Sequence, residues 1–331
     1  MEGFNTVTEP MRMPPSVLQQ LGDPQTSVRA ELSSGLMASQ PSISPKFLYD
    51  ALGSKLFEAI CETPEYYPTR TEAAIFARHG PEIARAIGPG CTLIDLGAGN
   101  CAKAASLFPL LHPSQYVPID ISQEFLQEAA TALHRRFPHI EMTPLGQDFS
   151  HGLTLPDTVD ERRRLFFYPG SSLGNFSPAE ALVLLKGLRA QCGCGGGLLL
   201  GLDLIKDVEL LEAAYDDALG VTAAFNLNVL RHVNRLIDAD FDVKQWRHRA
   251  CFNAREGRME MHLQACSDLT VRWLGGVCER RFHDGQCIHT ENSYKYRQDD
   301  AHDLLANAGF QSERVWLDAE GGFAVIHAYA R

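Results

Sequence analysis

The sequence lacks long hydrophobic runs. None of its 331 residues belongs to a stretch approaching the roughly 20 apolar residues that a membrane-spanning helix needs. The N-terminal segment Met1–Pro24 mixes charged residues with prolines and lacks the apolar segment of a secretory signal peptide. We therefore expect a cytoplasmic protein without a membrane partner.

Positive charge is also scarce, with 30 lysines and arginines against 41 acidic residues and a net charge of -11. Nucleic acid and anionic membranes would be repelled by such a chain. A hydrophobic content of 45% is ample for one large domain or two coupled ones. We expect a monomer that acts on a small molecule.

Closely spaced cysteines are nearly absent. Only Cys192 and Cys194 are near neighbours, and the other seven are scattered singly: Cys61, Cys91, Cys101, Cys251, Cys266, Cys278 and Cys287. Two thiols hold a soft metal only with further ligands, and no second cluster has zinc-finger spacing. We expect the seven scattered cysteines to be buried free thiols, the segment around Cys192 to be a glycine-rich turn, and no metal site.

Short apolar runs alternate with helical patterns from Thr92 onward, which is typical of a parallel sheet with crossover helices. The expected strands are Thr92–Leu96, Tyr116–Ile121, Ile140–Leu145, Arg164–Tyr168 and Gly197–Leu204, and the expected helices are Cys101–Leu111, Gln123–Arg136 and Pro178–Gln191. This pattern predicts an open, doubly wound, Rossmann-like α/β domain whose ligand lies at the carboxyl ends of the strands.

The alternation stops after Ile205 and resumes near the C-terminus. Helices are expected at 207–218 and 225–238, then a charged stretch, β-like runs at 259–265 and 269–273, a helix at 298–308 and a hairpin of 314–317 with 323–329. We predict that residues 71–205 and 297–331 form the α/β domain. Residues 1–70 and 206–296 are predicted to form a second, inserted α+β domain that binds the substrate.

The N-terminal region shows less pattern. Met1 to about Glu31 is expected to be irregular, and Pro45–Ala59 to be helical. The segment Pro64–Arg70 is expected to be a loop, because proline disfavours helix at the residue before it. Its adjacent tyrosines, Tyr66 and Tyr67, fit either a ligand contact or ordinary packing.

Three features follow successive predicted strands. Gly97 and Gly99 form a turn that lets a ligand approach the backbone at a helix start. Asp120 can accept both hydroxyls of an adenosine ribose, as in NAD enzymes. Asp148 and Phe149 offer a carboxylate for the adenine amino group and a ring to stack on it. This order favours an S-adenosylmethionine-dependent methyltransferase over a nicotinamide-dependent dehydrogenase or three unrelated loops.

Small residues end the fourth predicted strand, in Tyr168–Pro178. Gly170 leaves room for a substrate where a transferred methyl group would lie, and Asn175 can donate and accept hydrogen bonds. Asn175 also begins a glycosylation sequon, which a cytosolic chain would not expose to the glycosylation machinery.

From about Pro45 to its C-terminus, the chain resembles the histidine-specific methyltransferases that make hercynine, the trimethylated histidine on the route to ergothioneine. The motifs that carry the resemblance are Phe47–Asp50, Gly53-Ser54, Leu56-Phe57, Pro64–Arg70, Gly170–Asn175, Ala214–Asp217, Phe225–Asn228, Ala239–Asp242 and Thr290–Lys295. The resemblance implies S-adenosylmethionine as methyl donor and the α-amino group of L-histidine as acceptor.

The resemblance also implies site residues. It assigns the donor to Gly97, Lys103, Asp120, Asp148 and Phe149. It assigns the amino acid to Tyr49, Phe57, Tyr66, Gly170, Asn175, Tyr215, Met261, Glu291 and Ser293. Asn175 and Tyr215 would orient the carboxylate, and Tyr49 would lie near the amine, so that Tyr49 and Asn175 are the catalytic candidates.

Imidazole recognition needs an acceptor and a rotatable hydroxyl, and Glu291 with Ser293 supplies both. Two residues apart on an extended segment, their side chains face the same side. Tyr66 would assist through water. Two alternatives stay open: an acceptor such as a tryptophan derivative, and a catalytically silent protein that binds the adenosyl ligand as a sensor.

Overall fold

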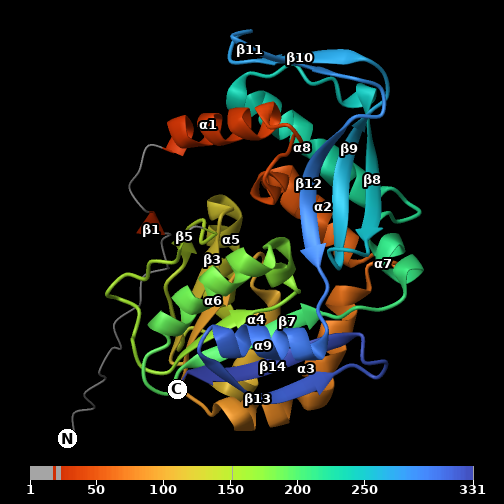
Figure 1. Ribbon diagram of the computed structural model, residues 1–331. Coiled ribbons are helices and arrows are strands. Elements are labelled where there is room, and N and C mark those ends of the chain that lie inside the picture. The colour runs from red at the N-terminus through yellow and green to blue at the C-terminus, as the bar shows by residue number, and fades with distance from the viewer. Residues whose placement is uncertain (1–17, 20–23, 151, 331) are drawn as a thin grey trace, which may run out of the picture.

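The computed structural model describes residues 18–19, 24–150 and 152–330 (Figure 1). A nine-stranded mixed sheet forms its larger layer, with the strand order β1-β5-β3-β2-β6-β7-β14-β13 and with β4 paired to β3. Its strands are β1 (Leu18–Gln19), β2 (Thr92–Leu96), β3 (Gln115–Asp120), β4 (Glu141–Met142), β5 (Leu145–Gly146), β6 (Arg164–Tyr168), β7 (Gly197–Asp203), β13 (Phe310–Leu317) and β14 (Phe323–Ala330).

Parallel pairing joins β1 through β7, while β14 runs antiparallel to both β7 and β13. The apolar strands of the sheet centre, such as β2 and β6, are buried along their whole length because helices cover both faces. One face packs against α3 (Tyr67–Ile87), α4 (Ala102–Leu111) and α5 (Gln123–Arg136). The other packs against α6 (Pro178–Gln191) and α9 (Gln298–Asn307).

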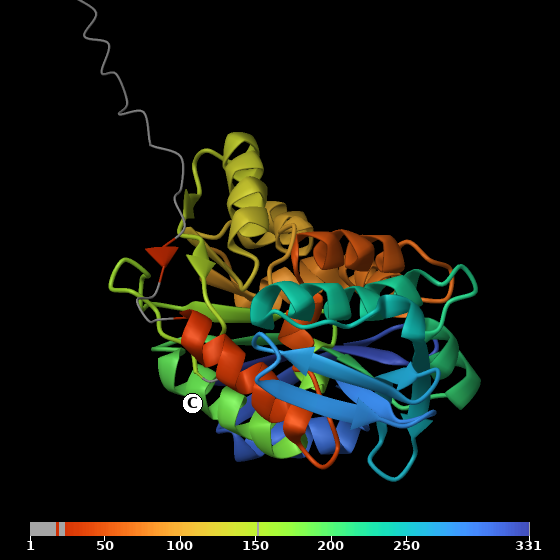
Figure 2. The ribbon, with the colours of Figure 1, turned by 90° about the horizontal axis from the view of Figure 1, so that it is seen from above.

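A second layer stands beyond the carboxyl edge of this sheet. Its core is a three-stranded antiparallel sheet in the order β12-β9-β8. The layer contains α1 (Pro24–Met37), η1 (Pro45–Leu48), α2 (Ala51–Cys61), α7 (Val208–Tyr215), α8 (Val221–Ile237), η3 (Val243–Gln245), β8 (Trp246–Asn253), β9 (Arg258–Ala265), β10 (Leu269–Trp273), β11 (Cys278–Phe282) and β12 (Cys287–Tyr294). Figure 2 shows α1 and α8 beside these strands.

The hydrophobic cores follow the same division. One cluster joins N-terminal side chains such as Leu36 and Leu48 to Val233, Leu263 and Ile288 of the second layer. Two other clusters fill the two faces of the large sheet. The predicted domain boundary at residues 70 and 71 falls inside α3, which runs without interruption from one layer into the other. The domain division itself stays a prediction.

The expected Rossmann-like sheet is confirmed, with several corrections to its elements. The predicted strand Ile140–Leu145 is two short strands, β4 and β5, and the helix expected at 207–218 ends at Tyr215. The charged stretch after α8 contains β8, because its arginines alternate with side chains that face the core. No helix among the described residues has the length and apolar character of a membrane span.

The N-terminal predictions were wrong at two places. Leu18–Gln19 form β1 and residues from Pro24 onward form α1 rather than irregular chain, while the prediction for residues 1–17 and 20–23 lies outside the described residues. The expected loop Pro64–Arg70 ends early, since α3 begins at Tyr67 with Pro68 in its first turn. Proline fits that position because its missing N–H would be unpaired there anyway. All nine cysteines are free thiols, but of the seven expected to be buried only Cys91 and Cys101 are; Cys266 is exposed and the others are partly exposed.

Candidate active site

The glycine turn lies between β2 and α4, at the carboxyl edge of the large sheet. Gly97 and Gly99 have φ angles of 69° and 53°, in the left-handed region that favours glycine. The amides of Gly97 and Ala98 both donate to the Ile119 carbonyl, at 2.9 and 3.0 Å. The turn is therefore fixed to β3, and apart from each glycine and its chain neighbours no atom of the described residues lies within 4 Å of where a Cβ would stand.

Asp120 ends β3 directly beside this turn. Its Oδ2 accepts the Gly99 amide at 2.9 Å and its Oδ1 accepts the Ser122 amide at 2.9 Å. Burial raises the pKa of this carboxyl, and the backbone amides oppose that shift. Each carboxylate oxygen keeps a further lone pair, which suits two neighbouring ribose hydroxyls.

Asp148 follows β5 and is already paired in the structure. Its Oδ2 accepts Lys46 Nζ at 3.0 Å, and Lys46 also pairs with Glu31 at 2.8 Å. The bonds from Ser150 and Lys46 outweigh burial and lower the pKa of Asp148. The Phe149 ring meets the Tyr168 ring edge-on at 5.9 Å. The predicted adenine contacts of Asp148 and Phe149 stay predictions.

Lys103 reaches from α4 to a residue that the sequence analysis missed. Its Nζ lies 2.8 Å from Oε2 of Glu72, whose other oxygen accepts the Gly170 amide at 2.8 Å. Glu72 is 1% exposed. A Cβ on Gly201 would lie 2.0 Å from Glu72 Oε1, so the glycine makes room for this carboxylate. Glu72 thus joins a predicted donor contact to the turn predicted to hold the substrate.

The structure brings all nine predicted amino-acid contacts to one pocket. Tyr49, Phe57, Tyr66, Gly170, Asn175, Tyr215, Met261, Glu291 and Ser293 line it. The lining side chains that were not predicted are Ile60, Ser171, Ser172, Ala214, Thr222 and Phe225. The pocket lies between the β6–η2 turn of the large sheet, where η2 is Ser172–Asn175, and the second layer.

Aromatic rings form one wall of this pocket. The Tyr49 ring lies 5.6 Å from Phe57 and 5.5 Å from Phe225, and Tyr66 lies 6.0 Å from Phe57 and 6.4 Å from Tyr215, measured between centroids. Burial raises the pKa of Tyr49 and Tyr66 well above the ordinary range, so both hydroxyls stay protonated. Phe225 belongs to a motif quoted above, which is the signal that would have identified it.

Polar side chains of β12 line the adjoining part of the pocket, which we call its polar end. Glu291 and Ser293 are both buried and line the same pocket, which agrees with the prediction that their side chains face the same side. Ser293 Oγ accepts the Tyr215 hydroxyl at 2.7 Å. Burial raises the pKa of Glu291 to about 7, while the charge of Lys295 opposes the shift. Glu291 is therefore balanced between its neutral and charged forms near neutral pH.

Ser171 closes the turn between these walls. Its φ of 57° is unusual for a residue with a side chain, and its Oγ accepts the Asp203 amide at 2.9 Å. Such backbone strain clusters at functional sites, where the surrounding structure holds it in place. The neighbouring residues are mostly small too, so no sequence pattern identifies Ser171 as the strained residue of this turn.

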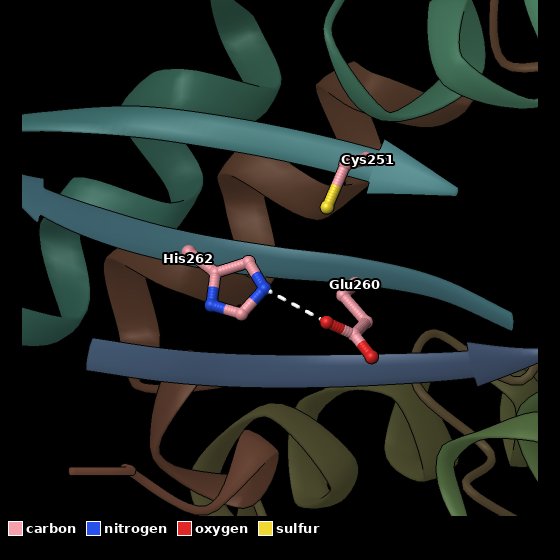
Figure 3. A group of neighbouring side chains, drawn as sticks. All are labelled: Cys251, Glu260 and His262. Carbon is pink, nitrogen blue, oxygen red and sulfur yellow. Dashed lines mark hydrogen bonds and ion pairs between the residues drawn. The ribbon is translucent and has the colours of Figure 1, made fainter. Parts of the chain in front are cut away.

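A separate polar group lies on β8 and β9 (Figure 3). Cys251, Glu260 and His262 bring ligand-type atoms within 4.8 Å of one another. Glu260 already bonds His262 Nε2 at 3.0 Å and Arg258 at 2.8 Å. Bonds from Asn253 and Arg258 outweigh burial and lower the pKa of Glu260 to about 2. Because Arg258 neutralises the carboxylate, we interpret the group as an ion-paired cluster.

Proteins with similar sequences include two histidine methyltransferases. Histidine N-alpha-methyltransferase of Mycolicibacterium smegmatis is 39% identical over 303 residues, covering 90% of this chain and 94% of that protein. Its namesake from Mycobacterium tuberculosis is 38% identical over 316 residues, covering 94% and 98%. Ergothioneine biosynthesis protein 1 of Neurospora crassa is 30% identical over 279 residues, covering 81% of this chain and 31% of that protein.

The sequence-family model of the histidine-specific, S-adenosylmethionine-dependent methyltransferases matches residues 28–330. That range includes the glycine turn, Asp120 and every residue of the pocket. The chain belongs to the family of histidine-specific, S-adenosylmethionine-dependent methyltransferases.

Proposed function

We propose that the protein transfers methyl groups from S-adenosylmethionine to the α-amino group of L-histidine. Three transfers give hercynine, an early intermediate of ergothioneine-type biosynthesis. Family membership and the names of its relatives support histidine as the acceptor. The observation that carries the proposal is that Glu291 and Ser293 together line one aromatic pocket at its polar end.

That polar end suits imidazole. A neutral imidazole has one N–H donor and one nitrogen lone pair, which match a carboxylate acceptor and a hydroxyl donor. The pKa of Glu291, about 7, lies near that of free imidazole, roughly 6.5, so one proton shared between them suits neutral pH. An indole ring offers no such lone pair, which favours histidine over a tryptophan derivative.

The donor residues fit an adenosyl ligand. Gly97 and Gly99 leave the space that side chains would fill, and Asp120 keeps lone pairs for the ribose hydroxyls. Lys103 and the Gly170 amide both bond Glu72, which holds the donor side and the substrate side in register. When bound, S-adenosylmethionine supplies an activated methyl group for in-line displacement by an amine.

The remaining work is positioning and proton removal. Asn175 and Tyr215 would orient the substrate carboxylate, and the Tyr49 hydroxyl would face the amine. Because burial keeps Tyr49 protonated, its oxygen can accept an N–H hydrogen bond but cannot act as a phenolate base. A reference α-amino pKa of roughly 7.7–8.0 leaves a usable neutral fraction near pH 7.5, so no stronger base is required.

Mass spectrometry tests the proposal. Purified protein with S-adenosylmethionine and histidine should yield a product carrying three added methyl groups, with mono- and dimethylated intermediates at early times. A panel of the other amino acids, tryptophan included, provides the comparison. If the protein binds S-adenosylhomocysteine but neither binds nor methylates histidine, the silent-sensor alternative is favoured and the proposal is contradicted.

A further inference from the structure

A buried lysine lies directly behind the polar end of the pocket. Lys295 is 5% exposed and is absent from the pocket lining. Its Nζ contacts Asp203 Oδ2 at 2.9 Å, the Tyr215 hydroxyl at 3.0 Å and Ser293 Oγ at 2.9 Å. An ammonium group has three protons, and these three acceptors match them. Two of the acceptors are pocket residues, so Lys295 sits one contact away from the substrate.

The charge of Lys295 is maintained by its surroundings. Burial alone lowers the pKa of this ammonium, but Asp203 outweighs burial and raises it. Asp203 also accepts the Tyr67 hydroxyl at 2.6 Å and is paired with Lys206. The carboxylate therefore has a second cation, which would still neutralise it if Lys295 were replaced.

Hydrogen-bond capacity restricts what the two hydroxyls can do. Each hydroxyl has one proton and two lone pairs, and Lys295 occupies one lone pair on each oxygen. Ser293 Oγ also accepts the proton of Tyr215, so both of its lone pairs are filled. The Ser293 proton is the group left to bond a ligand. If a bound carboxylate takes the Tyr215 proton instead, one lone pair of Ser293 Oγ is released, but Lys295 still fills the other and leaves the Ser293 proton for the substrate.

We propose that Lys295 is a positioning residue that fixes Ser293 as a hydrogen-bond donor toward the amino-acid side chain. The inference rests on the proposed function, because a ring nitrogen of histidine is the acceptor. Without Lys295, the Ser293 hydroxyl is free to accept or donate. The pocket then no longer selects a substrate atom with a lone pair at that position. Lys295 thereby helps to determine the substrate without touching it.

The test is a double-mutant cycle on kcat/KM for histidine. Lys295→Met in the wild-type background should lower kcat/KM about 10- to 100-fold, the effect of losing a charge-assisted hydrogen bond. In a Ser293→Ala background, the same substitution should lower it by no more than about threefold, because the oriented hydroxyl is already gone. An equal loss in both backgrounds overturns the inference and indicates a merely structural role.

Lys206→Met is the matched control. Lys206 pairs with the same Asp203 carboxylate, but its other contact is Tyr67, at 2.9 Å, and it does not reach Tyr215 or Ser293. This variant should stay within about threefold of wild type, because Lys295 still neutralises Asp203 and still bonds Tyr215 and Ser293. S-adenosylhomocysteine should bind all variants alike. A loss in Lys206→Met as large as in Lys295→Met would also overturn the inference.

Further controls keep folding and function separate. If Lys295→Met alone unfolds, the triple variant Asp203→Asn, Lys206→Met and Lys295→Met removes the carboxylate and both of its cations, and it should fold yet remain impaired toward histidine. Recovery of full activity in that triple variant contradicts the inference. A wild-type protein that neither binds nor methylates histidine overturns the proposed function and the inference together, whereas an active wild type with an unaffected Lys295→Met overturns the inference alone.

Discussion

The region predicted to bind the donor and the region predicted to bind the substrate, called the donor side and the substrate side below, are built differently. On the donor side, Asp120 is held by backbone amides from its own turn and from the adjacent glycine turn. On the substrate side, Glu291 and Ser293 are buried, and Ser293 accepts a hydrogen bond from Lys295, which is itself buried. Local turns thus set the donor side, whereas distant parts of the chain set the substrate side.

The largest effect should come from the substrate side. Glu291→Ala removes the acceptor for an imidazole N–H, and we expect kcat/KM for histidine to fall roughly 100-fold or more. S-adenosylhomocysteine affinity should be unchanged in calorimetry, because Asp120 and the glycine turn are untouched. Glu279→Ala, at an exposed position of β11, is the control. A parallel loss of donor affinity would break the distinction between the two sides.

A smaller effect should follow from the donor side. Asp120→Asn replaces one carboxylate oxygen by an amide donor, and S-adenosylhomocysteine affinity should weaken about 10- to 100-fold in calorimetry. Asp160→Asn is a matched control, because Asp160 Oδ1 also accepts the amide two residues on, that of Arg162, at 2.9 Å. If both variants bind the donor product like wild type, Asp120 has no part in donor binding.

The smallest expected effect concerns stability. Because the pKa of Glu291 in the folded protein is about 7 against an ordinary 4.5, its ionisation costs folding free energy as pH rises through that interval. Glu291→Gln cannot ionise, so it should be more stable than wild type by up to roughly 3 kcal/mol at pH 8, at about 1.4 kcal/mol for each unit of the shift. The difference should vanish near pH 4.5 in thermal unfolding. A constant difference at all pH values would contradict this origin.

Sequence patterns predicted the elements that local periodicity determines. The helices Gln123–Arg136 and Pro178–Gln191 and the strand Arg164–Tyr168 have the bounds that were expected. The strand Trp246–Asn253 was missed because its outward arginines made the segment look merely charged. Alternation on a half-exposed strand is easily hidden by long polar side chains.

Residues that act through distant partners were not predictable from such patterns. Glu72 accepts a hydrogen bond from the Gly170 amide, 98 residues later in the chain, and no local motif predicts that contact. Lys295 stands at the end of a quoted motif, yet its role depends on Asp203, Tyr215 and the burial of all three side chains. The family resemblance identified pocket residues, but the supporting network required the fold.

The helix α3 has a consequence for building chimeric enzymes. It begins at Tyr67, whose hydroxyl bonds Asp203, carries Glu72 beside Lys103, and ends at Ile87 under the large sheet. A recombination point at residues 70 and 71 would separate Tyr67 from Glu72 within one helix. Exchanging substrate specificity between relatives should therefore transfer α3 whole, together with the pocket it supports.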